Sequence, residues 1–319
     1  MTLDLAWDDG QQAIVDALGQ FCRDRCSDEV TRTASDSFPT EIWGELAELG
    51  VLATGTPEGD GGPEEIAAAM EALGRAVFPG PLVASFFATH VLPEKERCAV
   101  ADGQAIVSVG SPPLLPWAHH ATLFIEFDGE RAWLARSASG GPAEGVTTLG
   151  SESWGRLELL RERELDGVAR AHQVSQMALA AYLAAAGQRL VEDAAEHART
   201  RMQFGKAIGE FQAVAHPLAD CYMRLSAATT LARAAASELE RAGGGERSAA
   251  LCAAARLSAS AASLEAAYVC HQVFGAIGIT LEGPVFHISR RIRQLASQPP
   301  GDRGDRESLL ASFGMGPAT

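Results

Sequence analysis

The chain has 319 residues, of which 47% are hydrophobic and 21% charged, so it can bury a core large enough for two or three domains and is not intrinsically disordered. Its formal net charge of −15 argues against a binder of nucleic acid or of anionic membranes, because both would repel it. A small anionic ligand remains compatible with this charge, since a few local arginines suffice to bind one.

Targeting signals and metal motifs are absent from the sequence. The N-terminus, "MTLDLAWDDGQQ", is acidic and lacks the apolar stretch of a signal peptide, and no apolar run reaches the roughly 18 residues of a membrane span. The six cysteines contain no Cys-x-x-Cys pair, so we expect reduced thiols in a cytoplasmic protein. Cys22 and Cys26 are spaced to share one helix face, but no His or second Cys pair is near, and we predict no metal site.

The first hundred residues are predicted to be helical. Apolar residues recur at helical spacing over about 9–26, and a second helix is predicted between Pro39 and Gly50. Two further helices are predicted over "PEEIAAAMEALGRAV" and over about 81–92. We therefore predict an N-terminal α-helical domain over residues 1–102.

The middle of the chain is predicted to form strands. "QAIVSVG", "ATLFIEFDGERAWLARS" and "WGRLELLRE" are short alternating or apolar runs, separated by Gly-, Pro- and Asp-rich turns. "FDGERAWLA" indicates a hairpin with Asp128-Gly129 at its turn. We predict a reduced β-domain over residues 103–167.

The C-terminal half is predicted to be a bundle of Ala-rich helices. Long helices are expected over about 168–201, 208–241 and 248–274, and a short fourth helix after Pro284. The predicted third domain, a four-helix bundle, covers residues 168–319. The predicted fold class is therefore α+β, mostly α.

One corner of the predicted bundle has unusual residues. The segment "RMQFGKAIGEFQAVAHPLAD" runs from Arg201 to Asp220, with Phe204 and its glycine breaking the helix and Gln212 near the start of the next. A guanidinium beside the free N–H groups of a helix N-terminus is a suitable site for a phosphate or pyrophosphate. The alternative is that Arg201 pairs with a surface carboxylate and Phe204 belongs to the core.

A second segment, "HQVFGAIGITLEGP", follows the third long helix. Gln272 is expected near the end of that helix, and Gly275 and Gly278 are expected to form a tight turn. By itself this pattern is also typical of an ordinary helix-ending corner.

Together these segments resemble the acyl-CoA dehydrogenase family. The helical, β and helical order matches that family's layout, and "WGELAELGVLATGTPEGDGG" and "EALGRAVFPGPL" are similar to its early helices. The resemblance implies flavin adenine dinucleotide (FAD) as cofactor. It also implies that the ADP half of an FAD held mainly by the neighbouring subunit is contacted by Arg201, Phe204, Gln212, Gln272, Gly275 and Ala276. Ala276 is a departure, since the family usually has a second Gly there.

The resemblance also implies a catalytic Glu that removes the α-proton of an acyl-CoA while hydride passes to the flavin. The segment after "RRIRQ" has no Tyr-Glu-Gly-Thr-like run, and the other family position corresponds here to Ser175. A Ser hydroxyl cannot serve as that base without a partner. We therefore predict no catalytic residue in this chain.

The predicted β-domain also lacks the family's Thr-Glu and Gly-Ser-Asp segments and its flavin-holding Trp strand. This pattern resembles the shortened subunits of heterotetrameric acyl-CoA dehydrogenases of sterol catabolism. The resemblance implies an α2β2 assembly with a longer homologous subunit, an acyl-CoA substrate of unknown acyl group, and little activity in the isolated chain.

Two other interpretations stay open. In the first, the chain is a divergent homo-oligomeric acyl-CoA dehydrogenase whose catalytic base lies elsewhere, with Glu282 as the candidate. In the second, it is a helical scaffold that binds no cofactor. The basic cluster Arg290, Arg291 and Arg293 is interpreted either as a solvated or intersubunit face or as a phosphate contact.

Overall fold

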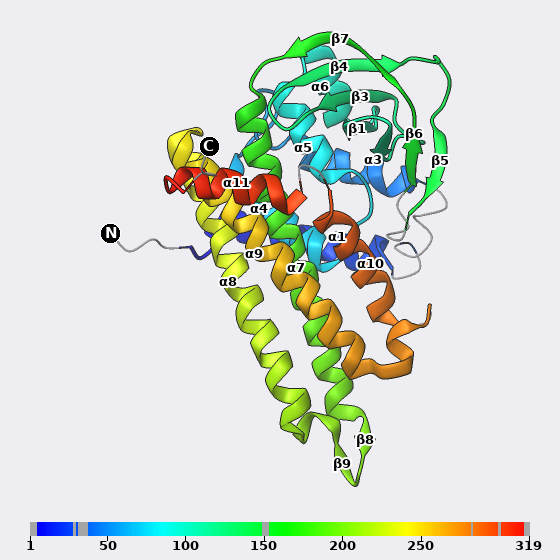
Figure 1. Cartoon of the computed structure of the whole chain (residues 1–319), viewed down its shortest axis with the longest axis vertical. Coiled ribbons are helices and arrows are strands. Elements are labelled where there is room, and N and C mark those ends of the chain that lie inside the picture. The colour runs from blue at the N-terminus through cyan, green and yellow to red at the C-terminus, as the bar shows by residue number, and fades with distance from the viewer. Residues whose placement is uncertain are drawn as a thin grey trace.

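The computed structural model describes residues 5–27, 30, 38–148, 153–281, 283–298 and 301–315. Helices come before and after a group of strands along the chain, and three long helices run down the molecule (Figure 1). The strands gather at one end of these long helices. The predicted fold class, α+β and mostly α, is confirmed.

The N-terminal part is helical, as predicted. Asp8 caps the first helix by accepting the N–H of Gln11 at 2.8 Å, and Gly50, with φ of 78°, follows the second. The helix α6, which the sequence pattern did not indicate, precedes the first strand. The elements are α1 (Asp9–Arg25), α3 (Thr40–Glu48), the 3-10 helix η1 (Val51–Ala53), α4 (Pro63–Arg75), α5 (Leu82–Val91) and α6 (Glu94–Ala101).

The strands form two small sheets, of order β1-β3-β4-β7 and β2-β6-β5. The predicted hairpin is confirmed: Asp128 accepts the N–H groups of Glu130 at 3.0 Å and Arg131 at 2.8 Å, which fixes the turn between β3 and β4. The strands are β1 (Val107–Gly110), β2 (Leu114–Pro116), β3 (Leu123–Phe127), β4 (Ala132–Ser137), β5 (Glu144–Thr147), β6 (Ser153–Arg156) and β7 (Leu159–Leu165).

The C-terminal half is the predicted bundle, in which α7, α8 and α9 pack against one another and α10 packs on α9 and α7. A small hairpin, β8–β9, and a further helix, α11, were not predicted. No helix within the described ranges is both long and apolar enough to cross a membrane. The elements are α7 (Val168–Thr200), β8 (Met202–Gln203), β9 (Lys206–Ala207), η2 (Ile208–Glu210), α8 (Gln212–Ala242), α9 (Glu246–Phe274), η3 (Gly275–Ile279), α10 (Pro284–Ala296) and α11 (Gly301–Ser312).

The main core joins the N-terminal helices to the bundle where α4 packs on α7. Most alanines along α7 are buried. Because their side chains are small, the backbone of α4 can approach α7 closely. At the contact, a Cβ added to Gly74 would lie 2.4 Å from the carbonyl oxygen of Tyr182. The two backbones therefore touch directly.

We expect Gly74→Ala to lower the free energy of unfolding by about 1–3 kcal/mol, because the methyl group would push α4 away from α7. Gly44, in α3, is the matched control, since an added Cβ would meet nothing within 4 Å. Gly44→Ala should stabilise the chain by about 0.5–1 kcal/mol through its better helix propensity. Urea unfolding measures both changes, and similar effects at the two glycines would contradict the direct backbone contact.

Candidate functional site

The corner between α7 and α8 is built as a small hairpin with an exposed aromatic tip. Arg201 follows the last residue of α7 and is exposed, and Phe204 and Gly205 form the turn between β8 and β9 with φ of 54° and 83°. Two positive φ values are typical of a type I′ turn, which normally has Asn or Gly at the first of these positions. Phe204 is 93% exposed, so a strained backbone presents a bare phenyl ring to the surroundings. The alternative that Phe204 belongs to the core is wrong.

Arg201 forms no ion pair with any residue that the structure describes. Arg199, two positions earlier, does pair with Glu196 at 2.8 Å. The alternative interpretation of Arg201, pairing with a surface carboxylate, therefore has no support among the described residues. The helix that follows begins after Phe211, which has no capping side chain, so the first N–H groups of α8 near Gln212 lack a side-chain acceptor. A guanidinium and an uncapped helix N-terminus at one corner form a site that suits an anion.

The second predicted segment lies beside this corner. The ring of His197, in the last turn of α7, stacks on Phe274 at the end of α9, with ring centroids 4.4 Å apart. Burial lowers the pKa of the His197 imidazole, and the charge of Arg201 lowers it further. Gly275, directly after Phe274, has a φ of 60°, which favours glycine. The chain ends of α7 and α9 are therefore held next to each other.

A groove between the hairpin, α8 and α9 includes two of the predicted residues, Phe204 and Gln272. Gln212 is exposed at the start of α8, and Ala276 is exposed in η3. Neither they nor Arg201 and Gly275 line the groove, so the structure brings only two of the six predicted residues together in it. The groove is lined by Gln203, Phe204, Ile208, Phe211, Ala213, Val214, Pro217, Val269, Gln272 and Val273.

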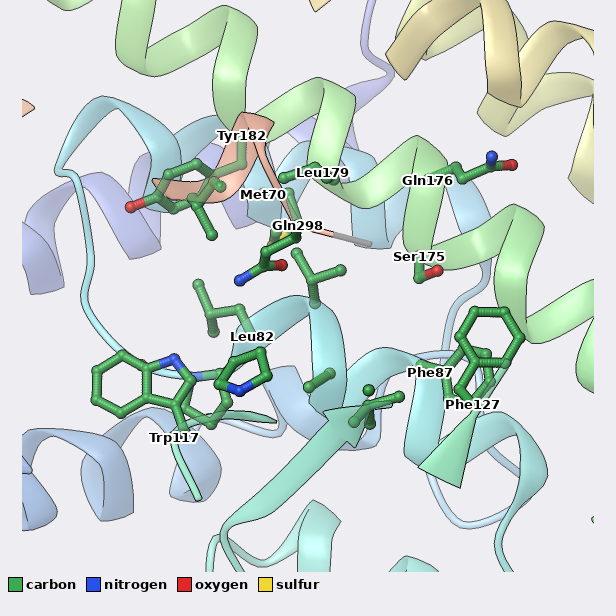
Figure 2. A pocket seen from close by; sticks show the side chains of 18 of the residues that line it. Met70, Leu82, Phe87, Trp117, Phe127, Ser175, Gln176, Leu179, Tyr182 and Gln298 are labelled. Carbon is green, nitrogen blue, oxygen red and sulfur yellow. The ribbon is translucent and has the colours of Figure 1, made fainter. Parts of the chain in front are cut away.

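A second hollow lies at the junction of the N-terminal helices, the strands and the bundle (Figure 2). Aromatic and aliphatic side chains, among them Leu82, Phe87 and Trp117, surround it. Its cavity volume is about 70 Å³, whereas small-molecule sites usually have roughly 300–1,000 Å³. This cavity does not fit a flavin ring or an acyl chain.

No Asp or Glu is among the described residues that line this cavity. Ser175, at the position considered for a catalytic base, does line it, and its hydroxyl donates to the carbonyl of His172 at 2.8 Å. A backbone carbonyl is not a base, so this contact cannot remove the proton of the Ser175 hydroxyl. Glu282, the other candidate base, lies outside the described residues.

Two buried arginines of the bundle, Arg256 and Arg291, line the cavity. Arg256 pairs with Asp305 of α11, and Gln176 donates to the same carboxylate at 2.5 Å. Arg291 is a buried residue of α10. Its guanidinium donates to the Gly80 carbonyl at 2.9 Å and to the Tyr182 hydroxyl at 3.3 Å. Burial lowers the pKa of the Arg291 guanidinium to about 9. Both sequence interpretations of the basic cluster are therefore wrong for Arg291, which is an internal packing residue.

The remaining members of that cluster cover aromatic rings. The Arg290 guanidinium lies 4.9 Å from the centre of the Phe286 ring, and that of Arg293 lies 4.7 Å from the centre of Tyr268. The described residues hold no group of three or more His, Cys, Asp or Glu side chains placed to bind a metal ion.

The helical, β and helical architecture defines the acyl-CoA dehydrogenase fold. The C-terminal domain model of acyl-CoA dehydrogenases matches residues 168–301, and the N-terminal domain model matches residues 8–94. The chain belongs to the acyl-CoA dehydrogenase family.

Two relatives come from Mycobacterium tuberculosis. The acyl-CoA dehydrogenase IpdE2 is 30% identical over 270 residues, covering 78% of this chain and 79% of IpdE2. The acyl-CoA dehydrogenase FadE34 is 30% identical over 274 residues, covering 76% of this chain. The matched region spans only 37% of the length of FadE34.

Solved structures share the fold over almost the whole chain. The ChsE4–ChsE5 complex from Mycobacterium tuberculosis has a TM-score of 0.82 at 23% identity, covering 99% of this chain and 100% of that one. A Tcur3481–Tcur3483 steroid ACAD variant has a TM-score of 0.82 at 20% identity, and the match covers 96% of this chain and 98% of that one. The FAD complex of PigA has a TM-score of 0.80 at 18% identity, and the match covers 98% of this chain and 100% of that one.

Proposed function

We propose that this chain is the subunit of a hetero-oligomeric, FAD-dependent acyl-CoA dehydrogenase that completes the cofactor site of a non-identical partner. In this proposal the partner holds most of the FAD and supplies the catalytic Glu. The chain described here contributes the corner formed by the β8–β9 hairpin, the start of α8 and η3. It supplies no catalytic residue of its own.

One contrast carries this proposal: the hairpin corner is exposed, while the chain's own cavity is too small for a flavin ring or an acyl chain. The corner has a bare Phe204 ring and an Arg201 without an ion pair among the described residues. It lies at the opposite end of the bundle from the sheets, whereas Phe127 and Val109 of the sheet line the cavity (Figure 1). A ligand bound at the corner would thus belong to a site that another molecule completes.

The individual residues would act on the ADP half of the cofactor. The Arg201 guanidinium and the N–H groups at the start of α8 would bind the pyrophosphate, and Phe204 would cover a ring. Gln212 and Gln272 offer amide groups, and Gly275 and Ala276 offer backbone close to the ligand. The flavin, when bound, accepts the hydride of the dehydrogenation, and this chain's residues hold its far end in place.

The similar structures support a mixed assembly. ChsE4–ChsE5 and Tcur3481–Tcur3483 are each named as two different chains, and the latter is described as a steroid ACAD. PigA was solved with FAD. We infer by analogy an α2β2 heterotetramer with a longer homologue and a steroid-derived acyl-CoA thioester as substrate. The free cysteines fit the cytoplasmic location that the sequence predicts.

The test is the visible spectrum and mass of the chain, purified alone and then co-expressed with a longer homologue as the candidate partner, the first choice being one encoded beside it. We expect a colourless protein alone and a yellow complex with one flavin for every two chains, because only the mixed interface would complete a cofactor site. A lone chain that carries one flavin per subunit and oxidises an acyl-CoA would overturn the proposal in favour of a homo-oligomeric enzyme. A protein that is colourless in both preparations would favour a scaffold without cofactor.

A further inference from the structure

A stacked pair of rings lies between the two segments that the proposed function assigns to the cofactor. His197 is in the last turn of α7, and Phe274 is the last residue of α9. Their ring centroids are 4.4 Å apart and their planes are inclined by only 16°, so the rings lie nearly parallel. Both residues are half-buried, and Phe274 also packs on the main core. The stack therefore joins the end of α7 to a residue that the core already holds.

On the α7 side, the stack leads directly to Arg201. The Arg201 N–H donates to the His197 carbonyl at 2.9 Å, and the Arg201 carbonyl accepts the N–H of Ile208 at 2.9 Å. Both backbone polar groups of Arg201 are thus fixed, one of them by the residue whose ring is stacked. Because burial and then the charge of Arg201 lower the pKa of the His197 imidazole, this ring is neutral at pH 7 and does not repel the guanidinium.

On the α9 side, the stack leads to the turn η3. Gly275, with a φ of 60°, follows Phe274 directly, and a Cβ added to Gly278 would lie 3.1 Å from the Cβ of Phe274. From α10, the Ser289 hydroxyl oxygen lies 2.8 Å from Nε2 of His271, one turn before Phe274. Since η3 packs on Phe274, a shift of this ring would move the turn.

We propose that His197 is a positioning residue, which sets the spacing between Arg201 and η3 through its stack on Phe274. This inference rests on the proposed shared cofactor site, in which one FAD is contacted from both segments. Groups that hold one ligand must be kept within about 0.5 Å of their productive positions by the residues behind them. His197 needs no contact with the cofactor to act in this way, and a flat apolar ring in its place should serve as well.

The first test needs no cofactor and uses the isolated chain. Hydrogen exchange by mass spectrometry is followed in peptides that cover the last turn of α9 and η3, residues 271–280. We expect His197→Ala to raise the exchange rate there by roughly 2- to 12-fold, the factor that corresponds to the free energy of one aromatic pair. His197→Phe, which keeps a stacked ring, should restore the wild-type rate.

The second test measures the FAD dissociation constant of the mixed complex. His197→Ala should weaken FAD binding by a similar factor, and His197→Phe should restore it, which the mere loss of a histidine would not explain. His216 is the matched control, because it lies near the start of α8 and is exposed. His216→Ala should change neither the exchange rate nor the affinity.

The two measurements separate this inference from the proposed function. An exchange rate that His197→Ala leaves unchanged, or that His197→Phe does not restore, overturns the positioning role whatever the flavin result. The role is also overturned if Arg201→Ala weakens FAD binding while His197→Ala does not. If exchange responds as expected but the wild-type complex holds no flavin, the coupling of the two segments stands and the shared cofactor site fails.

Discussion

Replacing Asp305 by Asn should lower the free energy of unfolding by about 3–5 kcal/mol, the usual cost of leaving one member of a buried ion pair without its partner. Arg256 and Asp305 are each only 1% exposed. The substitution keeps the shape and the contact with Gln176, but it removes the negative charge. The Arg256 guanidinium would retain a carbonyl acceptor, that of Gln298 at 2.9 Å, without a countercharge. Thermal and urea unfolding of the purified chain measure this effect.

An exposed pair between neighbouring helices is the control. Arg224 and Glu265 link α8 and α9 with side chains 62% and 41% exposed. Glu265→Gln should change stability by less than about 1 kcal/mol, because solvent screens exposed pairs. The double variant Arg256→Met with Asp305→Leu should recover much of the loss by replacing the pair with apolar packing. If Asp305→Asn proves as mild as Glu265→Gln, the pair is not buried in solution.

This ion pair also lies at the wall of the chain's own cavity. Arg256 and Gln176 both line the cavity, and both bind Asp305 of α11. Arg256 also donates a hydrogen bond to the carbonyl of Gln298, which follows α10, and so holds this part of the chain in place. The C-terminal helix is therefore fixed against α9 and α7 by charge as well as by packing.

The sequence predicted the long helices well because their signals are local. Alanine-rich runs indicated α7, α8 and α9 to within a few residues, although α7 contains Gly187 and α8 contains Pro217, and the Asp-Gly pair indicated the β3–β4 hairpin. The α6 helix was missed because it is short and half of its residues are charged, and α11 because its sequence, "GDRGDRESLLAS", contains two glycines. Neither has the apolar periodicity on which such a prediction depends.

The site residues divide in a similar way. The Arg and Phe-Gly pattern marked the corner between α7 and α8, but it did not predict that Phe204 would stand exposed at the tip of a hairpin. The burial of Arg291 could not be predicted either, since its acceptors at Gly80 and Tyr182 lie more than a hundred positions away in the chain. The cavity is lined by residues from the N-terminal helices, the strands and the bundle, so no single segment encodes it. The glycine of "LGR" in α4, Gly74, is where α4 touches α7, and it is the residue in the sequence that could have indicated this contact.

In the mixed complex, Arg201→Ala should weaken FAD binding by roughly 10- to 150-fold, because a charge-assisted hydrogen bond is worth about 1.5–3 kcal/mol. This expectation rests on the proposed shared cofactor site. Arg201 is exposed at the end of α7, so its loss should leave folding and assembly unchanged. The measurements are the FAD dissociation constant of the complex by flavin fluorescence, and its mass and melting temperature as checks on assembly.

Arg199→Ala separates a specific contact from the general loss of a positive charge. Arg199 lies on the same turn at the end of α7 but already pairs with Glu196 at 2.8 Å, and both side chains are largely exposed. Its removal should change FAD affinity less than about twofold, because long-range attraction between exposed charges is screened at physiological salt. Equal effects of the two substitutions would mean that the corner attracts the cofactor only through its overall charge. No effect of Arg201→Ala would place the pyrophosphate elsewhere, and the exposed hairpin would then have to be explained by contact with the partner chain alone.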